Sequence, residues 1–181
     1  KEFVVVIGYL GEKIKEYVDE AYPSIEKKYV VQETREGLGH AIWLTKDVIP
    51  KKSEVMIVLG DTIIDVDWKK FIGLKTSALG VKKVNDPRKF GVAEFDNEGN
   101  IIHVVEKPTI PKSNMALVGL YKIKEFDILI KSIDHNIKHN IRSNNEFYLT
   151  DGLQEMIRRG VKVEGFKVDN WYDCGQKEVL L

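Results

Sequence analysis

The alternation of strand and helix patterns in the first 60 residues is the feature that most restricts the fold of this chain. Residues 2–8 form a continuous β-branched run, typical of a parallel strand that helices cover. An apolar helical stripe begins at Gly11, a short strand lies at Tyr29–Gln32, and a second helical stripe runs over residues 37–49. Residues 55–60 are apolar enough for a strand buried on both faces. Three strands that alternate with two helices predict a parallel, doubly wound sheet.

The middle of the chain changes to strand-like runs that follow one another without a helix between them. These runs are residues 78–84, 91–96, 101–108 and 115–123. Asn97–Gly99 supplies the turn chemistry for a hairpin between the second and third runs. Because consecutive strands are joined by turns here and by helices earlier, we expect a mixed sheet.

The last third of the chain returns to helical patterns. Residues 124–133 form an amphipathic stripe, and a further helix is expected with Thr150 or Asp151 as its cap and Gly160 at its end. Residues 161–168 indicate a late strand, and residues 170–181 are expected to form a turn that runs into the start of a helix. We find no repeat or linker, so residues 1–181 are expected to form one α/β domain.

Composition excludes several classes of partner. The 28 lysine and arginine residues balance 28 aspartate and glutamate residues, so no overall basic field exists to attract nucleic acid or an anionic membrane. Apolar runs such as FVVVIGYLG fall far short of the roughly 20 residues that a membrane span needs. The one cysteine, Cys174, cannot form an internal disulfide and suits a reducing compartment, so we expect a cytoplasmic protein.

The stretch GLGHAI, which begins at Gly37, admits three interpretations. Gly37 and Gly39 match the start of a dinucleotide-binding fingerprint, but Ile42 stands where the third glycine belongs. Alternatively, the two glycines allow close packing at a helix N-terminus. In the third interpretation, Gln32 and Gly37 flank a loop that reads the edge of a nucleobase, because a glutamine side chain both donates and accepts hydrogen bonds.

Two aspartates stand beside glycines after apolar segments. In LGD, Asp61 follows the strand at residues 55–60, and in WYDCG, Asp173 follows an aromatic pair. A carboxylate at the end of a buried strand is costly without a partner. If the two carboxylates meet at the carboxyl ends of strands, they form a hard oxygen site suited to Mg²⁺ beside a phosphate. The structural alternative is that Asp61 caps a helix and Asp173 forms a turn.

Glu106 and Lys107, in VVEKP, end a strand with opposite charges. Adjacent strand residues point to opposite faces, so Glu106 would face a polyhydroxylated ligand while Lys107 reaches phosphate oxygens as a point charge. The alternative is a solvated strand end. His135 and His139 are four residues apart with no third ligand in the stretch, which argues against a zinc site.

In chain order, these motifs resemble the sugar-phosphate nucleotidyltransferases, the family of glucose-1-phosphate thymidylyltransferases and uridylyltransferases. The matching segments are VVVIGYLGEKIKEYV, VQETREGLGHAI, IVLGDTI, FGVAEFDNEGNIIHVVEKPTIPKSNMALVGLY, NEFYLTDGLQEMIRRG and VEGFKVDNWYDCGQ. The stretch from Phe90 to Tyr121 and the closing WYDCG are the most specific. The resemblance implies a Rossmann-like three-layer fold with a mixed central sheet. It implies a reaction in which a sugar 1-phosphate oxygen attacks the α-phosphorus of a nucleoside triphosphate, giving a nucleotide sugar and pyrophosphate.

The resemblance also implies roles for residues that bind the nucleotide. Asp61 and Asp173 would hold Mg²⁺ against the α-phosphate, and Lys107 would bind the sugar phosphate. Gln32 and Gly37 would contact the nucleobase. Such a transfer depends mostly on positioning and on neutralising charge.

The sugar has its own set of residues by the same resemblance. Gly91 and Glu106 would hold its hydroxyls, with the backbone of Leu117 and Val118 nearby. The expected partners are therefore a nucleoside triphosphate, either dTTP or UTP, and a sugar 1-phosphate, with glucose 1-phosphate favoured. GLGHAI leans toward the uridylyltransferases and EKPTIPKSNMALVGLY toward the thymidylyltransferases, so the choice of nucleotide stays open, as does that of the sugar. The oligomeric state also stays open, with a homo-oligomer among the options.

Three features depart from the family pattern. The family has a glycine-rich signature loop, G-G-x-G-T-R-L followed by Pro-Lys, which wraps the triphosphate. In the family this loop precedes the segment that corresponds to FVVV here. We therefore expect an N-terminally incomplete nucleotidyltransferase domain that lacks its first strand and this loop, cut from a longer native protein. Cys174 and Thr62 replace the family's usual threonine and asparagine, and neither change removes a carboxylate. The alternative functions are a non-catalytic nucleotide-sugar-binding or regulatory module and an NAD-binding domain.

Overall fold

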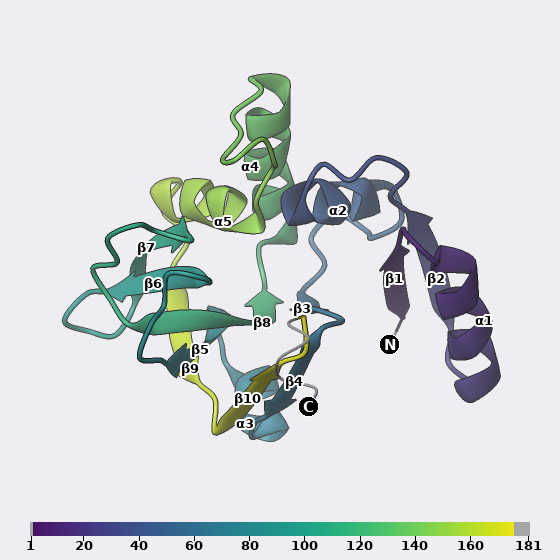
Figure 1. Ribbon diagram of the computed structural model, residues 1–181, viewed down its shortest axis with the longest axis horizontal. Coiled ribbons are helices and arrows are strands. Elements are labelled where there is room, and N and C mark those ends of the chain that lie inside the picture. Colours follow the sequence, from purple (N-terminus) through teal and green to yellow (C-terminus); the bar gives the residue numbers. More distant parts are fainter. Residues whose placement is uncertain (1, 176–181) are drawn as a thin grey trace.

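The first part of the chain forms a βαβ unit in the computed structural model, which describes residues 2–175. Strands β1 (Phe3–Ile7) and β2 (Lys27–Val31) pair in parallel, and helix α1 (Gly11–Ala21) joins them. Figure 1 shows this unit to one side of the remaining sheets. The parallel pairing confirms the first step of the expected doubly wound pattern.

The third expected strand pairs differently from the prediction. Strand β3 (Val55–Val58) pairs antiparallel with β8 (Met115–Ile123), and not with β1 or β2. The expectation that it is buried on both faces is also wrong, because Met56 and Val58 are each 48% exposed. These side chains line a cavity of about 860 Å³ that β1 also lines, which we call the open groove. A strand beside such a space keeps one face uncovered.

The central sheet is mixed, as the sequence predicted. Its strand order is β7–β6–β8–β5–β9, with β3 added to β8. The strands not yet given are β5 (Ser77–Lys83), β6 (Gly91–Phe95), β7 (Ile101–Glu106) and β9 (Val163–Lys167). Within this sheet, as far as residues 2–175 describe it, only β5 and β9 pair in parallel, and β6 and β7 form the predicted hairpin around a turn with Gly99 at φ 87°. Strand β8 lies at the centre, and all its residues after Met115 are buried.

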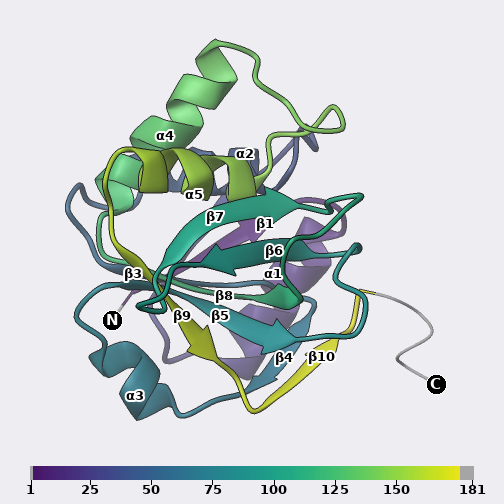
Figure 2. The same cartoon turned by 90° about the vertical axis from the view of Figure 1, so that its left-hand side faces the viewer.

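Helices cover both faces of this sheet. On one face lie α2 (Leu38–Leu44), the short 3-10 helix η1 (Thr45–Asp47), α4 (Phe126–Lys138) and α5 (Leu149–Arg158), as Figure 2 shows for α4 and α5. On the other face, α3 (Trp68–Gly73) buries Phe71 against Val118 and Leu120. Fully burying such a side chain stabilises the folded state by roughly 1.5–3 kcal/mol. Because apolar clusters pack on both faces of the sheet, β8 is held from both sides. No helix within residues 2–175 is long and apolar enough to cross a membrane.

A separate two-stranded sheet was missed by the sequence patterns. It pairs β4 (Thr62–Asp65) antiparallel with β10 (Asn170–Asp173), two strands of four residues each. The turn expected at the beginning of residues 170–181 is thus largely a strand, and residues 176–181, where the helix start was expected, lie outside the described residues. Helix α3 was also missed, although Asp67 caps it by accepting the Lys70 backbone N–H.

The expected cap of α5 is wrong as well. Tyr148 stands at its N-cap position and makes no side-chain capping bond, while Thr150 and Asp151 lie inside the first turn. The Thr150 hydroxyl donates instead to Glu106 Oε2, at 3.1 Å. A side chain that resembles a cap in the sequence is therefore directed at the end of β7.

Candidate active site

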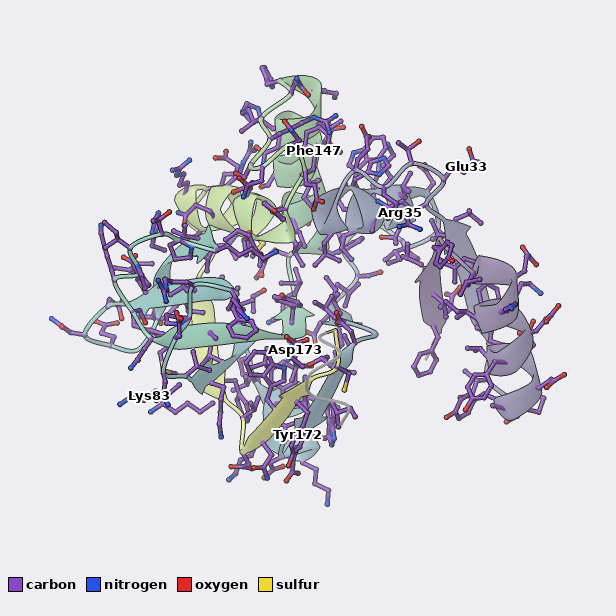
Figure 3. All side chains as sticks on the ribbon, in the orientation of Figure 1. Glu33, Arg35, Lys83, Phe147, Tyr172 and Asp173 are labelled. Atoms are coloured by element: carbon purple, nitrogen blue, oxygen red, sulfur yellow. The ribbon has the colours of Figure 1, made fainter. Side chains whose placement is uncertain are left out.

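A cavity of about 230 Å³ lies where the β4–β10 sheet meets β8, and we call it the carboxylate hollow. It is lined by all the residues expected at the metal and the sugar, namely Asp61, Gly91, Glu106, Lys107, Leu117, Val118 and Asp173. Figure 3 labels Asp173 at the end of β10, near the middle of the molecule. The fold thus brings together residues from five separate strands or strand ends.

Asp61 and Asp173 face one spot although they are 112 positions apart in the sequence. The β4–β10 ladder places Asp173 opposite Thr62, and the Cys174 backbone N–H donates to the Asp61 carbonyl at 2.7 Å. A Cβ added to Gly175 would stand 2.9 Å from Asp61 Oδ2 and 3.1 Å from Asp173 Oδ1. The two carboxylates therefore border the same small volume.

The structural alternatives to a metal role were a helix cap for Asp61 and a turn for Asp173, and the structure supports only the second. Asp61 precedes β4 and no helix, so it caps none within the described structure. Asp173 Oδ1 does accept the Gly175 backbone N–H at 3.0 Å, the local contact of a turn. Residues 2–175 contain no cluster of three or more metal-binding side chains. A pair of carboxylates nonetheless fits Mg²⁺, which is usually held by one or two carboxylates with water and substrate phosphates.

Glu106, the last residue of β7, lines the hollow. Burial raises the pKa of its carboxyl above the ordinary value, while the Thr150 hydroxyl and Lys107 act in the opposite direction. A Cβ on Gly91 would stand 3.0 Å from Leu117 Cδ1 and Thr150 Cγ2, and 3.2 Å from Glu106 Oε2. A larger residue at position 91 would therefore force one of these side chains to shift.

Lys107 departs from the expected orientation. Its backbone has φ 42°, which ends the strand geometry that would place its side chain opposite that of Glu106. Instead Lys107 Nζ lies 3.9 Å from Glu106 Oε1 and 5.7 Å from the centre of the Tyr148 ring. Both charges therefore line the same hollow, and the prediction of opposite faces is wrong.

Gln32 and Gly37 lie together, away from the carboxylate hollow. Gln32 follows β2 and lines the open groove, and its Nε2 donates to the Gly37 carbonyl at 3.1 Å. Gly37 has φ 102°, and a Cβ there would stand 2.7 Å from the Phe147 carbonyl oxygen. A Cβ on Gly39 would be equally close to that oxygen, which accepts the Gly39 backbone N–H. The glycines thus allow close packing at the start of α2, and Figure 3 labels Phe147 above that helix.

Several residues of the hollow were not found from the sequence. Thr62, Lys89, Phe90, Tyr121, Thr150 and Trp171 also line it. Burial raises the pKa of the Tyr121 hydroxyl far above its ordinary value, so this group stays neutral. The sequence did offer a signal for two of them. Thr62 directly follows Asp61, and Trp171 stands two residues before Asp173. Residues close to a metal-binding side chain often orient it.

Comparisons with known proteins find relatives that match nearly the whole chain. The chain is 35% identical over 173 residues to the bifunctional protein GlmU of Methanocaldococcus jannaschii, covering 95% of the chain and 40% of that relative. It is 28% identical over 186 residues to the UTP–glucose-1-phosphate uridylyltransferase AglF of Haloferax volcanii, covering 98% of the chain and 74% of that relative. The crystal structure of a UDP-glucose pyrophosphorylase complexed with UDP-glucose has the same fold, with a TM-score of 0.77 at 23% identity over 98% of this chain and 77% of that one.

The chain therefore spans about two fifths of the length of the first of these relatives. The sequence model of the nucleotidyl transferase family matches residues 1–181. That match covers every segment on which the resemblance was based, including both aspartates of the hollow. The chain belongs to the nucleotidyl transferase family.

Proposed function

We propose that the protein transfers a nucleoside monophosphate from dTTP or UTP to a sugar 1-phosphate, with glucose 1-phosphate as the expected sugar. A phosphate oxygen of the sugar 1-phosphate forms a bond to the α-phosphorus. The bond from that phosphorus to the oxygen bridging to the β-phosphate breaks, and pyrophosphate leaves. The observation that carries the proposal is the carboxylate hollow, where Asp61 and Asp173 share one small cavity with Glu106 and Lys107.

The charges of the hollow suit this reaction. Asp61 and Asp173 are the residues that would hold Mg²⁺, which when bound neutralises charge on the triphosphate. The Lys107 side chain is 49% exposed at the rim, so its ammonium group can reach a phosphate as a point charge. The hollow thus offers two carboxylates to a cation and one ammonium group to a phosphate.

Glu106 supports the assignment of a sugar subsite beside them. One of its oxygens accepts a hydrogen bond from the Thr150 hydroxyl, which fixes the side chain, and the absence of a side chain on Gly91 allows the close approach of Glu106. A carboxylate held in this way accepts hydrogen bonds from the hydroxyls of a sugar. The hollow is small, which suits one pyranose ring better than an extended polymer.

The orientation of the Gln32 amide supports a base with a ring N–H. The Gly37 carbonyl can only accept, so the Gln32 amide must direct its NH₂ group toward it. His40 Nδ1, at 3.1 Å from the same nitrogen, is then an acceptor. Gln32 Oε1 makes no hydrogen bond to any residue within 2–175. An acceptor oxygen fixed in this way matches the N3–H of uracil or thymine, which cytosine lacks.

The open groove supports a further part of the proposal, that another strand and the glycine-rich loop complete the nucleotide half of the site. In the described part of the chain, β1 pairs only with β2 and β3 pairs only with β8, and both line the groove. One further strand would satisfy the free backbone edges of both and cover Phe3, Met56 and Val58. The family's signature loop follows such a strand.

Pyrophosphate release from the protein at its natural length tests the proposal, over a panel of nucleoside triphosphates and sugar 1-phosphates. We expect turnover with UTP or dTTP and little with CTP. No turnover with any pair, together with calorimetric binding of a nucleotide sugar, would instead support the alternative of a non-catalytic nucleotide-sugar-binding or regulatory module. Binding of NAD without binding of any nucleoside triphosphate would contradict both.

A further inference from the structure

The Thr62 hydroxyl joins three strands beside the two aspartates. Its Oγ1 donates to the Val118 carbonyl of β8 at 2.8 Å and accepts the indole N–H of Trp171, in β10, at 2.9 Å. Thr62 is itself the first residue of β4. A single hydroxyl thus fastens the two-stranded sheet to the central sheet, and we call these three residues the hydroxyl bracket.

The Val118 carbonyl can accept the hydrogen bond from Thr62 because the pairing of β8 with β5 is irregular at this point. The ladder between β5 and β8 shifts register between the pairs Leu79–Tyr121 and Val81–Leu117, and Val118 falls within the shift. Gly119, the next residue, has φ 79°, a conformation that other residues rarely adopt. The bulge directs a backbone carbonyl to a side chain on another sheet.

Thr62 is linked through the backbone to both aspartates. Thr62 directly follows Asp61 in the chain and is the ladder partner of Asp173. The hydroxyl helps to hold the Thr62 backbone in place, and a shift of that backbone would displace both aspartates. We propose that Thr62 is a positioning residue, which sets the separation of the Asp61 and Asp173 carboxylates and so tunes the affinity of the hollow for a divalent cation. This inference rests on the proposed metal role of the two aspartates.

Other contacts hold the β4–β10 sheet together without the hydroxyl. The Cys174 N–H donates to the Asp61 carbonyl, and at the opposite end of the sheet the Asn170 side chain donates to Asp65 Oδ2 at 3.1 Å. The Trp171 ring also packs edge-on against Phe90, with 4.9 Å between ring centres. Loss of the hydroxyl is therefore expected to loosen the geometry of the hollow and leave the sheet paired.

The test is the affinity for Mn²⁺, a hard divalent cation that stands in for Mg²⁺, measured from the electron paramagnetic resonance signal of the free ion. Thr62→Val replaces the hydroxyl by a methyl group of the same shape, and Thr62→Ser keeps the hydroxyl. Trp171→Phe removes only the indole donor and keeps a ring against Phe90. The matched control is Thr45→Val, because Thr45 is buried, its hydroxyl donates to the Ile42 carbonyl, and it does not line the hollow.

We expect Thr62→Val to weaken Mn²⁺ binding about 10–100-fold, the usual effect of removing a group that orients a metal ligand. Thr62→Ser should stay within about threefold of the wild type, Trp171→Phe should lie between the two, and Thr45→Val should leave the affinity unchanged. Wild-type affinity in Thr62→Val, or equal weakening in Thr62→Val and Thr45→Val, would overturn the inference. A wild-type protein that binds no Mn²⁺ would overturn it together with the metal site. Binding that depends on Thr62 in a protein with no turnover would instead refute the proposed reaction alone.

Discussion

The carboxylate hollow and the open groove differ in how far the described residues complete them. The hollow is bordered by β4, β8, β10 and the ends of β6 and β7, and hydrogen bonds of Thr62 and Glu106 join neighbouring elements around it. The groove is bordered by strands with unpaired edges, and Phe3 is 52% and Met56 48% exposed beside it. Under the proposed function, the described residues would form the metal and sugar half of the site, and a further segment in the groove would complete the nucleotide half.

The two aspartates of the hollow should give the largest effect. Asp61→Asn and Asp173→Asn each remove a charge with little change in shape, so turnover should fall by about 10²–10³-fold, the usual cost of losing one group that stabilises charge in the transition state. The melting temperature should change little. Turnover of the protein at its natural length and its melting curve are the measurements.

Asp127→Asn is the matched control, because Asp127 forms only an exposed pair with Lys131 on α4 and such pairs contribute little. Unchanged turnover is expected there. If the hollow aspartates were purely structural, their asparagine variants would lose stability and keep their activity per folded molecule.

A charge in the groove should give the next largest effect. Val58→Lys places a cation where we propose that a strand packs, and burying an unpaired charge should lower the free energy of unfolding by more than about 2 kcal/mol. Denaturant unfolding of the protein at its natural length measures it. Ile102→Lys on β7 is the control, since Ile102 is 52% exposed outside the groove and should change stability by no more than about 0.5 kcal/mol. Equal, small effects in both variants would show that nothing covers β3.

The base-reading glutamine should give a more moderate effect. Gln32→Leu removes the acceptor Oε1, and the loss of one hydrogen bond of about 1.4 kcal/mol should raise the KM for UTP or dTTP about tenfold. The KM for glucose 1-phosphate should stay the same, because Gln32 lies outside the hollow. A change in both constants, or in neither, would remove Gln32 from the nucleobase site.

The smallest effect concerns stability and pH at Glu106. Burial raises the pKa of this carboxyl in the folded state, so ionisation opposes folding and the protein loses stability as pH rises through that pKa. Glu106→Gln should therefore be more stable than the wild type at neutral pH, and the difference should vanish below the ordinary pKa of 4.5. Melting temperatures of both proteins across that range are the measurement. A variant that is less stable at neutral pH would contradict the assigned cause.

The sequence predicted the hollow better than the strands that form it. The spacing of apolar residues identified β1, β5 and β8, and the order of motifs identified Asp61 and Asp173, because each lies in a distinctive local pattern. The partners of β3 could not be predicted, since pairing with β8 joins segments about 65 residues apart and no local pattern specifies it. Strands β4 and β10 are four residues long, too short for a clear alternation.

The orientation of individual side chains also could not be predicted from the sequence. The positive φ of Lys107 directs its side chain to the same hollow as Glu106, and nothing in VVEKP signals that conformation. Thr150 has the composition of a cap but serves Glu106, a residue 44 positions earlier. Such roles follow from tertiary contacts, which composition and periodicity do not contain.

The central claim is that Asp61 and Asp173 hold one divalent cation in the carboxylate hollow. A crystal structure of the protein with Mn²⁺ and a nucleoside triphosphate tests it most directly, with the ion located by its anomalous scattering. We predict one ion within coordinating distance of an oxygen from each carboxylate and of a phosphate oxygen, and no ion there in Asp173→Asn. An ion bound away from both aspartates, or unchanged in Asp173→Asn, would contradict the claim.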